Sequence, residues 1–484
     1  MRLRFAPSPT GNLHIGTLWI SLFNWVFAKG QNATLVLRIE DTDTERSKPE
    51  FEHNIFESLA WMGIEVDESP LKGGPYAPYR QSERIQQGLY KKQALSLVDQ
   101  KKAYYCFCTD ADLDQERLEA QAKKVPYIYS QKCTHLKPED VQEKLNSGNP
   151  HTIRFKIPRA HTQTFKDLIR GEISFDMSLI SDFVLVKSDG TPSYNFAVVV
   201  DDMSMAITHI IRGEDHISNT PRQLELYQAF GATPPHFAHL PLILGPDKSK
   251  LSKRHGATSV KEFKDLGYLN SALMNYLMLL GWSSPDGKEL LNMADVIQTF
   301  SLERVSKSGA VFDLVKLKWM NGHYIRELNL DSLYAAVRPY MSEELFTKLS
   351  AMFTEDQIKL MAMSIQDNLD LLADINTYLA VYAQTLEEFK TQVSTFTFSE
   401  QDHKVLTVFQ QFIQEAPPLT PSGIDQILAQ VLESTQLGKG KVFKPIRLAS
   451  SAMASGPHLP DFMSILGKES LLERLSFVST LKAH

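Results

Sequence analysis

The first residues able to do chemistry lie near the N-terminus, where an apolar-basic run gives way to a turn. Residues 6–16 read APSPTGNLHIG, so two prolines and Gly11 stop the run, and His14 stands two residues before Gly16. A helix N-terminus offers unpaired N–H groups and a positive dipole end to an anion. Glycines let such a backbone approach a phosphate, and histidine can donate a hydrogen bond to it. The stretch indicates a phosphate-binding loop, although the start of a helix with a structural histidine explains a lone match equally well.

A second group of polar residues is the basic run 250–254, which reads KLSKR. It follows an apolar stretch at 242–244 and a turn at 245–247. Lysines on such a loop suit a triphosphate, because ammonium groups and a metal ion stabilise the charge that develops in phosphoryl transfer. Taken alone, a run of this kind is more often a solvated surface loop. Its position after the first motif, on the same expected α/β unit, favours a pair of nucleotide-binding loops.

The three cysteines of the chain lie in one short segment. Cys106 and Cys108 are followed by Cys133, with His135 two residues further on. Three thiolates and an imidazole are a ligand set that can close a tetrahedral zinc site, and buried inert cysteines are the alternative. An odd number of cysteines in a long chain also argues against a disulfide framework and for a reducing compartment.

The elements that must position these groups read as an interrupted α/β domain. Apolar spacing predicts strands and helices in alternation, at 3–6, 15–28, 34–39 and 50–62. This order implies a parallel sheet with a right-handed crossover. A second series is expected beyond residue 193, with two strands and then a helix, at 194–200, 206–211 and 221–230. The segment between the two series, with short β-like runs such as 152–157, looks like an insertion.

From about residue 328 the pattern becomes almost wholly helical. Segments such as 356–378 and 402–414 are separated by proline or glycine, with the clearest breaks at 417–418 and 438–441. We therefore predict an α/β protein with a Rossmann-like parallel-sheet domain, an α+β insertion and an all-α C-terminal half. The expected parts are the first half of the sheet domain, the insertion, the second half and the helical region, at 1–102, 103–185, 186–325 and 326–484.

Composition limits the classes of partner. A chain of 484 residues is too long for one compact core, and 43% hydrophobic with 22% charged residues is ordinary for a soluble globular protein. A net charge of -6 gives no global basic footprint, so a nucleic acid would have to bind through local patches. No apolar run approaches 18 residues, and proline and glycine come too early for a signal peptide. We expect a cytoplasmic monomer with no membrane partner.

Together, these motifs resemble those of class I aminoacyl-tRNA synthetases. Residues 6–16 are similar to the HIGH motif, with Thr17 in place of its second histidine, and 250–254 is similar to the KMSKS loop. Other stretches resemble the bacterial-type glutamyl-tRNA synthetase family, namely LRIEDTD at 37–43, YNFA at 194–197, IRGEDH at 211–216, VFDL at 311–314 and WMNG at 319–322. The resemblance covers essentially the first 325 residues and, more loosely, the helical remainder.

The resemblance implies binding sites for glutamate and ATP. For glutamate it implies Arg4, Ser8, Glu40, Tyr194 and Arg212. For ATP it implies His14, Gly16, Lys253 and Asp215, with His14 and Lys253 catalytic, and the two loops add Gly11, Lys250 and Arg254. Residue chemistry agrees, because arginines that end strands of a parallel sheet can bind carboxylates bidentately in the crevice there. A surface ion pair is the alternative for each arginine. Glu40 suits the substrate ammonium group, whereas Asp41 and Asp43 suit loop organisation.

The implied reaction has two steps. The glutamate α-carboxylate attacks the α-phosphorus of ATP, with Mg²⁺, His14 and Lys253 offsetting negative charge, and diphosphate leaves. A ribose hydroxyl of the 3'-terminal adenosine of tRNA-Glu, the 2'-hydroxyl by resemblance, then takes the glutamyl group and releases AMP. The resemblance further implies that tRNA must bind before activation. No side chain is expected to act as a covalent nucleophile.

The resemblance also implies a structural zinc ion in the insertion. Its ligands would be Cys106, Cys108, Cys133 and His135, with Tyr129 as the alternative fourth ligand. The insertion would bind the tRNA acceptor end, and 186–325 would include the KMSKS loop and a stem contact.

The helical half would read the anticodon. A basic patch there is a candidate contact, although a solvated face explains it equally well, and it comprises Lys439, Lys441, Lys444 and Arg447. Asn368 stands where family members that reject tRNA-Gln often carry arginine, which leaves open an enzyme that also charges tRNA-Gln. The alternatives are a glutaminyl-tRNA synthetase and a small-molecule nucleotidyltransferase of the same fold. The helical half argues against both.

Overall fold

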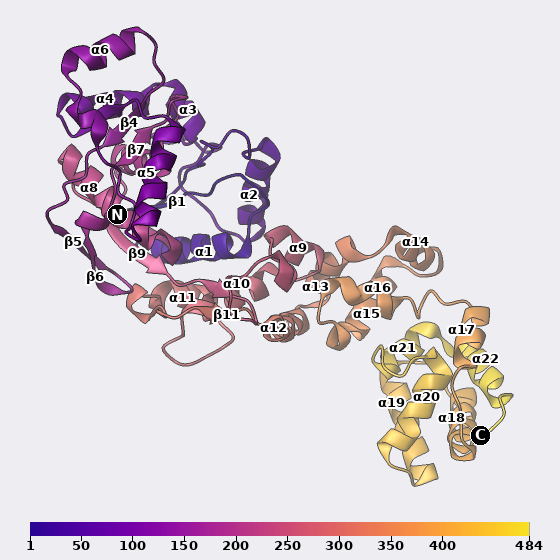
Figure 1. Cartoon of the computed structure of the whole chain (residues 1–484). Helices are drawn as coiled ribbons and strands as arrows, with labels where there is room; N and C mark the ends of the chain where they lie inside the picture. Colours follow the sequence, from indigo (N-terminus) through magenta and orange to yellow (C-terminus); the bar gives the residue numbers. More distant parts are fainter. Residues whose placement is uncertain (484) are drawn as a thin grey trace. The chain divides into compact units, whose positions relative to one another are not determined.

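The computed structural model describes residues 1–483 and divides into two compact units. The first unit comprises Met1–Glu262 and Met274–Asp313, and the second comprises Phe263–Leu273 and the chain from Leu314 onward. Figure 1 shows that strands are confined to the first part of the sequence and that the later part is helical. No helix within residues 1–483 is long and apolar enough to cross a membrane.

A six-stranded sheet forms the centre of the first unit. Its order is β2-β1-β8-β9-β5-β6, with bounds Thr34–Leu37, Arg2–Phe5, His209–Gly213, His236–Leu240, Thr162–Asp167 and Gly171–Asp176. All neighbouring strands pair in parallel except β5 and β6, which form an antiparallel hairpin. The core strands β1 and β2 are almost continuously buried, as expected for a parallel sheet covered on both faces. The predicted strand–helix–strand unit at the N-terminus is thereby confirmed.

Helices join these strands. Those of residues 1–313 are α1 Ile15–Gly30, α2 Pro49–Trp61, α3 Gln81–Gln86, α4 Leu89–Asp99, α5 Asp110–Ala122, α6 Pro138–Asn146, α7 Tyr194–Ser204, α8 Thr220–Phe230, α9 Val260–Asp265, α10 Asn270–Gly281 and α11 Met293–Thr299. The short strands β10 Ile243–Leu244 and β11 Ala310–Val311 pair in parallel.

The strand expected at 194–200 is wrong, because these residues belong to helix α7. Residues 196–200 read FAVVV, an unbroken apolar run in which periodicity cannot separate a strand from a buried helix. The valines favour a strand by propensity. All five residues are nevertheless buried in the core, where α7 contacts α4 and α8, so packing overrides propensity. The next strand also begins later than expected, at His209.

The segment 103–185 contains a smaller sheet of its own. Strands β3 Ala103–Cys106, β4 Thr152–Phe155 and β7 Phe183–Val186 form an antiparallel sheet in the order β3-β4-β7. Its loops carry a short 3-10 turn, η1 Lys132–His135, between α5 and α6. The same segment also supplies β5 and β6 to the edge of the main sheet, since β5 pairs with β9. The expected insertion therefore adds strands to the α/β core.

The second unit is helical beyond residue 314, which confirms the predicted helical half but starts it earlier than the expected residue 326. Its helices are α12 Leu314–Arg326, α13 Leu330–Val337, α14 Glu343–Met352, α15 Glu355–Ser364, α16 Ile375–Leu379, α17 Leu386–Val393, α18 Glu400–Glu415, α19 Pro421–Thr435, α20 Lys439–Ser451, α21 Leu459–Leu466 and α22 Lys468–Ser479. One apolar core runs through them, and α18 contacts α19, α20 and α22 (Figure 1).

Two local expectations for this unit need correction. The helical segment expected at 356–378 is interrupted between α15 and α16 by two 3-10 turns, the first of which is η7 Gln366–Asn368. The break expected at 438–441 is the start of α20, with Gly438 as its N-cap. Glycine is tolerated at an N-cap, so a glycine there marks the beginning of a helix as readily as a break.

Candidate active site

A cavity of about 510 Å³ opens at the carboxyl ends of β1 and β8 in the first unit. This edge of a parallel sheet is where such folds bind ligands. All the residues predicted to bind glutamate line the cavity, and so do most of those predicted to bind ATP: Arg4, Ser8, Glu40, Tyr194, Arg212, Gly11, His14, Gly16, Asp215 and Lys250. Lys253 and Arg254 are absent from its wall, within the described residues.

His14 is held at the N-terminus of α1. Its Nδ1 accepts a hydrogen bond from the Gly16 N–H at 3.0 Å, and the next residue, Ile15, donates its N–H to the Thr258 carbonyl at 2.7 Å. Because Nδ1 is an acceptor, the imidazole proton resides on Nε2. Burial and the nearby Lys250 lower the pKa of His14, which keeps the ring neutral near pH 7. His14 thus offers one N–H donor beside the helix N-terminus, an arrangement suited to a phosphate.

Arg212 is a buried cation with one unused donor. Its Nη2 donates to Thr220 Oγ1 at 2.8 Å, and its Nε donates to His239 Nε2 at 3.1 Å. Nη1 is buried and has no hydrogen-bond partner among the described residues. Burial lowers the pKa of Arg212, as expected for a cation removed from water. A buried guanidinium with an unsatisfied N–H on a cavity wall calls for an anionic ligand.

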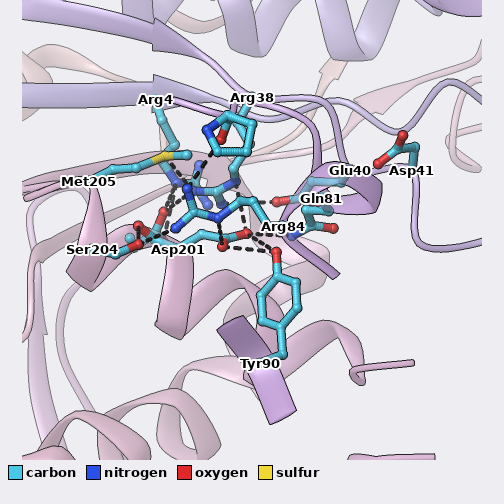
Figure 2. Close-up of polar contacts among 12 residues, drawn as sticks. Arg4, Arg38, Glu40, Asp41, Gln81, Arg84, Tyr90, Asp201, Ser204 and Met205 are labelled. Atoms are coloured by element: carbon cyan, nitrogen blue, oxygen red, sulfur yellow. Dashed lines mark hydrogen bonds and ion pairs between the residues drawn. The ribbon is translucent and has the colours of Figure 1, made fainter. Parts of the chain in front are cut away.

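A buried network of charges holds Arg4 and Glu40, two more of the residues predicted to bind glutamate (Figure 2). Arg4 Nε lies 3.3 Å from Asp202 Oδ1, and Arg38 Nη1 lies 2.6 Å from the same oxygen. Arg38 Nη2 donates to Glu40 Oε1 at 3.0 Å. Burial raises the pKa of Glu40, and the charge of Arg38 opposes that rise. Arg38 therefore links two predicted substrate-binding residues. It contacts Glu40 directly, and it contacts Arg4 through the shared carboxylate of Asp202.

Asp201 extends the network on its other side. Arg84 Nε lies 2.7 Å from Asp201 Oδ1, and the carboxylate also accepts hydrogen bonds from Gln81 and Tyr90 (Figure 2). The arginines at 4, 38 and 84 thus face the carboxylates at 40, 201 and 202, all of them buried. Buried charges persist when paired and hydrogen-bonded in this way.

Sequence reasoning missed this network, although the sequence carries a signal for it. Arg38 directly follows β2 within the apolar stretch 35–39, and Asp201 and Asp202 end the apolar run of α7. Charged residues at fully buried positions of core elements are rare without partners. The expected loop role of the other acidic residues fits the structure, because Asp41 accepts from the Ser82 N–H at 2.8 Å and Asp43 pairs with Arg46.

The basic run 250–254 lies on a loop whose last residues form the 3-10 turn η4 Lys253–His255. Lys250 Nζ lies 3.0 Å from Asp215 Oδ2, so these two predicted ATP-site residues meet at the cavity. Arg254 Nη2 lies 2.9 Å from Asp247 Oδ2, within the loop itself. Lys253 and Arg254 have exposed side chains. The loop thus places Lys250 at the cavity, whereas Lys253 and Arg254 lie in solvent away from its wall.

The three cysteines converge. Their sulfur atoms all lie within 4.8 Å of one another, and Cys108 Sγ is 3.5 Å from Cys133 Sγ. The Tyr129 hydroxyl lies 3.1 Å from Cys108 Sγ and 3.4 Å from Cys106 Sγ, and the Tyr129 side chain is buried. His135 is exposed and does not join this cluster among residues 1–483. A set of three thiols and a phenol fits a tetrahedral metal site, with Tyr129 rather than His135 beside the sulfurs.

Comparisons with known proteins show the family of the chain. Residues 1–319 match the model described as tRNA synthetases class I (E and Q), catalytic domain, and 332–478 match an anticodon binding domain. The chain is 42% identical to a glutamate–tRNA ligase of Carboxydothermus hydrogenoformans, covering 98% of this chain and 99% of the relative. It is 41% identical to glutamate–tRNA ligase 2 of Thermoanaerobacter pseudethanolicus, covering 98% and 97%. The crystal structure of a glutamate tRNA ligase from Elizabethkingia meningosepticum, in complex with its amino acid, superposes with a TM-score of 0.87 at 35% identity and full coverage of both chains.

Proposed function

The chain belongs to the class I tRNA synthetases of the glutamate and glutamine branch, and we propose that it is a glutamate–tRNA ligase. The observation that carries the substrate is the buried Arg212, whose Nη1 lacks a partner on the wall of a cavity that Arg4 also lines. Two cations suit a substrate with two carboxylates, whereas glutamine offers only one. A small-molecule nucleotidyltransferase would leave the anticodon domain without a role.

We assign the substrate roles as follows. Arg4 and Arg212 bind the glutamate carboxylates, with Ser8 and Tyr194 beside them, and Glu40 binds the ammonium group. ATP places its phosphates at Gly11, Gly16 and the His14 Nε2–H, and its ribose near the Asp215–Lys250 pair. Mg²⁺, when bound with ATP, offsets phosphate charge. These groups hold the two substrates at one edge of the sheet, where one can attack the other.

The chemistry then depends on positioning and charge. A carboxylate oxygen of glutamate forms a bond to the α-phosphorus as the bond to the β-phosphate oxygen breaks, which yields glutamyl-adenylate and diphosphate. His14 and Lys253 stabilise the charge on the transferring phosphoryl oxygens. A ribose hydroxyl of the tRNA 3'-terminal adenosine then forms an ester with the glutamyl carbonyl carbon, and AMP leaves.

We further propose where tRNA binds. The segment 103–185 would receive the acceptor end, 186–325 would contact the stem, and 326–484 would read the anticodon. On α20, Lys439, Lys441 and Lys444 are exposed, whereas Arg447 is half-buried and donates to the Pro457 carbonyl at 2.7 Å. The anticodon contact is therefore assigned to the three lysines. We also propose a cytoplasmic monomer.

The test of function is ATP–diphosphate exchange with the full chain. We expect exchange that requires glutamate and a bound tRNA, with tRNA-Glu active, and no exchange with glutamine as the amino acid. Because Asn368 places no cation at the end of η7, we also expect tRNA-Gln to support exchange and to be charged with glutamate. Exchange with glutamine but not glutamate contradicts the proposed substrate, and failure of tRNA-Gln alone shows a discriminating ligase.

We propose that Cys106, Cys108, Cys133 and Tyr129 hold a structural zinc ion. The support is the approach of the three sulfurs and the Tyr129 hydroxyl, and the ion would join β3 to the loop around η1. The purified protein should contain one zinc per chain by elemental analysis. Tyr129→Phe should weaken zinc retention against a chelator by about tenfold or more. His135→Ala is the matched control and should retain zinc; the reverse order assigns the fourth ligand to His135.

A further inference from the structure

Three neighbouring strands place a buried line of polar side chains behind the cavity. Arg212 on β8 lies opposite His239 on β9 in the parallel register, and Asp167 ends the adjacent strand β5. Arg212 Nε lies 3.1 Å from His239 Nε2, and His239 Nδ1 lies 2.6 Å from Asp167 Oδ2. The side chains of His239 and Asp167 are both 0% exposed. None of the sequence motifs includes His239 or Asp167.

The direction of each hydrogen bond in this line is fixed by chemistry. An arginine can only donate, so His239 Nε2 accepts and its proton lies on Nδ1. Nδ1–H then donates to the Asp167 carboxylate. Asp167 is itself held, because its Oδ1 accepts the N–H groups of Ile169 at 3.0 Å and Arg170 at 2.9 Å. One tautomer of the imidazole satisfies every partner.

The charge distribution agrees with that tautomer. Burial lowers the pKa of His239, with Asp167 opposing the effect and the charge of Arg212 adding to it. A protonated ring would turn a second N–H toward Arg212, and the oxygen near Nε2, Thr220 Oγ1 at 3.3 Å, already accepts from Arg212 Nη2. His239 therefore remains a neutral acceptor against the guanidinium.

These contacts leave one nitrogen of the Arg212 guanidinium, Nη1, without a hydrogen-bond acceptor within residues 1–483. Nε is fixed by His239, Nη2 is fixed by Thr220, and Nη1 is buried without a partner among the described residues. We propose that His239, held in its Nδ1–H tautomer by Asp167, is a positioning residue that orients Arg212 toward a substrate carboxylate. This inference rests on the proposed function and adds to it two residues that do not touch the substrate.

If His239 had only a packing role, a different substitution at position 239 would be tolerated best. The His239 ring lies parallel to the Phe237 ring at 6.2 Å and edge-on to Phe165 at 6.4 Å. If the ring only fills space, phenylalanine should replace it best. If the acceptor atom matters, glutamine should replace it best, because its Oε1 can take the place of Nε2.

The experiment compares His239→Phe with His239→Gln in the full chain, by tRNA-dependent ATP–diphosphate exchange. We expect His239→Phe to raise the KM for glutamate by about tenfold, the consequence of leaving one charged donor unpaired, with the KM for ATP within about twofold of wild type. His239→Gln should lie closer to wild type. A lower glutamate KM for His239→Phe than for His239→Gln, or equal rises in both substrate KM values, overturns the proposal.

Asp167→Asn is a second variant, which tests the proposal even if His239→Phe does not fold. An amide can donate to Nδ1 and so stabilise the wrong tautomer, which turns Nε2 into a donor against Arg212. The glutamate KM should again rise while the ATP KM does not. A glutamate KM that stays at the wild-type value in a folded Asp167→Asn variant overturns the role of Asp167. Absence of glutamate-dependent exchange in the wild type would reject the proposed function instead.

Discussion

Lys253→Ala is expected to lower the rate of glutamyl-adenylate formation by about 100-fold or more, the cost of removing one donor to a transition-state charge. The dissociation constant for glutamate should stay within about twofold of wild type. Lys253 is exposed and does not line the cavity that holds Arg4 and Arg212, so it has no route to the bound amino acid. In the proposed function its charge acts only when ATP is bound and the loop 245–256 carries it to the phosphates, so glutamate binding alone should not depend on it. Single-turnover activation and equilibrium glutamate binding measure the two quantities separately.

Lys248→Asn is the matched control for this prediction. Lys248 lies on the same loop, is exposed, and has a positive φ of 61°, a conformation that asparagine tolerates. The control removes the same charge from the same loop and should leave activation within about threefold of wild type, since exposed charges are largely screened. Equal losses in activation and glutamate affinity for Lys253→Ala would contradict its role. So would an equal loss of activation in both variants.

The sequence was sufficient to predict the parts of the site that depend on turns and on the order of strands and helices. Prolines and glycine end β1 and lead into α1, and parallel strands bring their carboxyl ends to one edge, so Arg4, Glu40 and Arg212 could be placed together before any coordinates. The spacing of the three cysteines was enough to predict that their side chains meet. The choice between Tyr129 and His135 was not predictable in this way, because both stand within a few residues of Cys133. Only the fold determines that the tyrosine is buried against the sulfurs.

The supporting residues were beyond sequence reasoning because their partners are distant in the chain. Arg38 meets Asp202 across 164 positions, and His239 meets Asp167 across 72. The error at 194–200 hid the first of these pairs. An expected strand there gave no reason to bring Asp201 and Asp202 to the core, whereas helix α7 carries both to the face of the sheet. Long-range pairing of buried charges is information that periodicity does not contain.

Arg38→Met is expected to destabilise the protein by about 3–5 kcal/mol, the usual cost of removing one partner from a buried charge network. The Arg38 side chain is 0% exposed and faces Asp201, Asp202 and Glu40. Methionine has a similar length but leaves one buried negative charge uncompensated. The first unfolding transition should fall by about 5–10 °C. The control is Arg117→Met, whose ion pair with Asp114 is mostly exposed and should contribute little.

The pH dependence of the melting temperature distinguishes a loss of charge compensation in Arg38→Met from a packing defect. Burial already raises the pKa of Glu40, and Arg38 opposes that rise, so its removal should raise the pKa further. A carboxyl whose pKa is higher in the folded than in the unfolded state adds stability as pH falls and removes it as pH rises. The difference in melting temperature between Arg38→Met and wild type should therefore be smaller near pH 5 than near pH 8. A cavity left by the shorter side chain would cost the same at both, so a pH-independent difference would contradict the role of Arg38 as the counter-charge of Glu40 and Asp202.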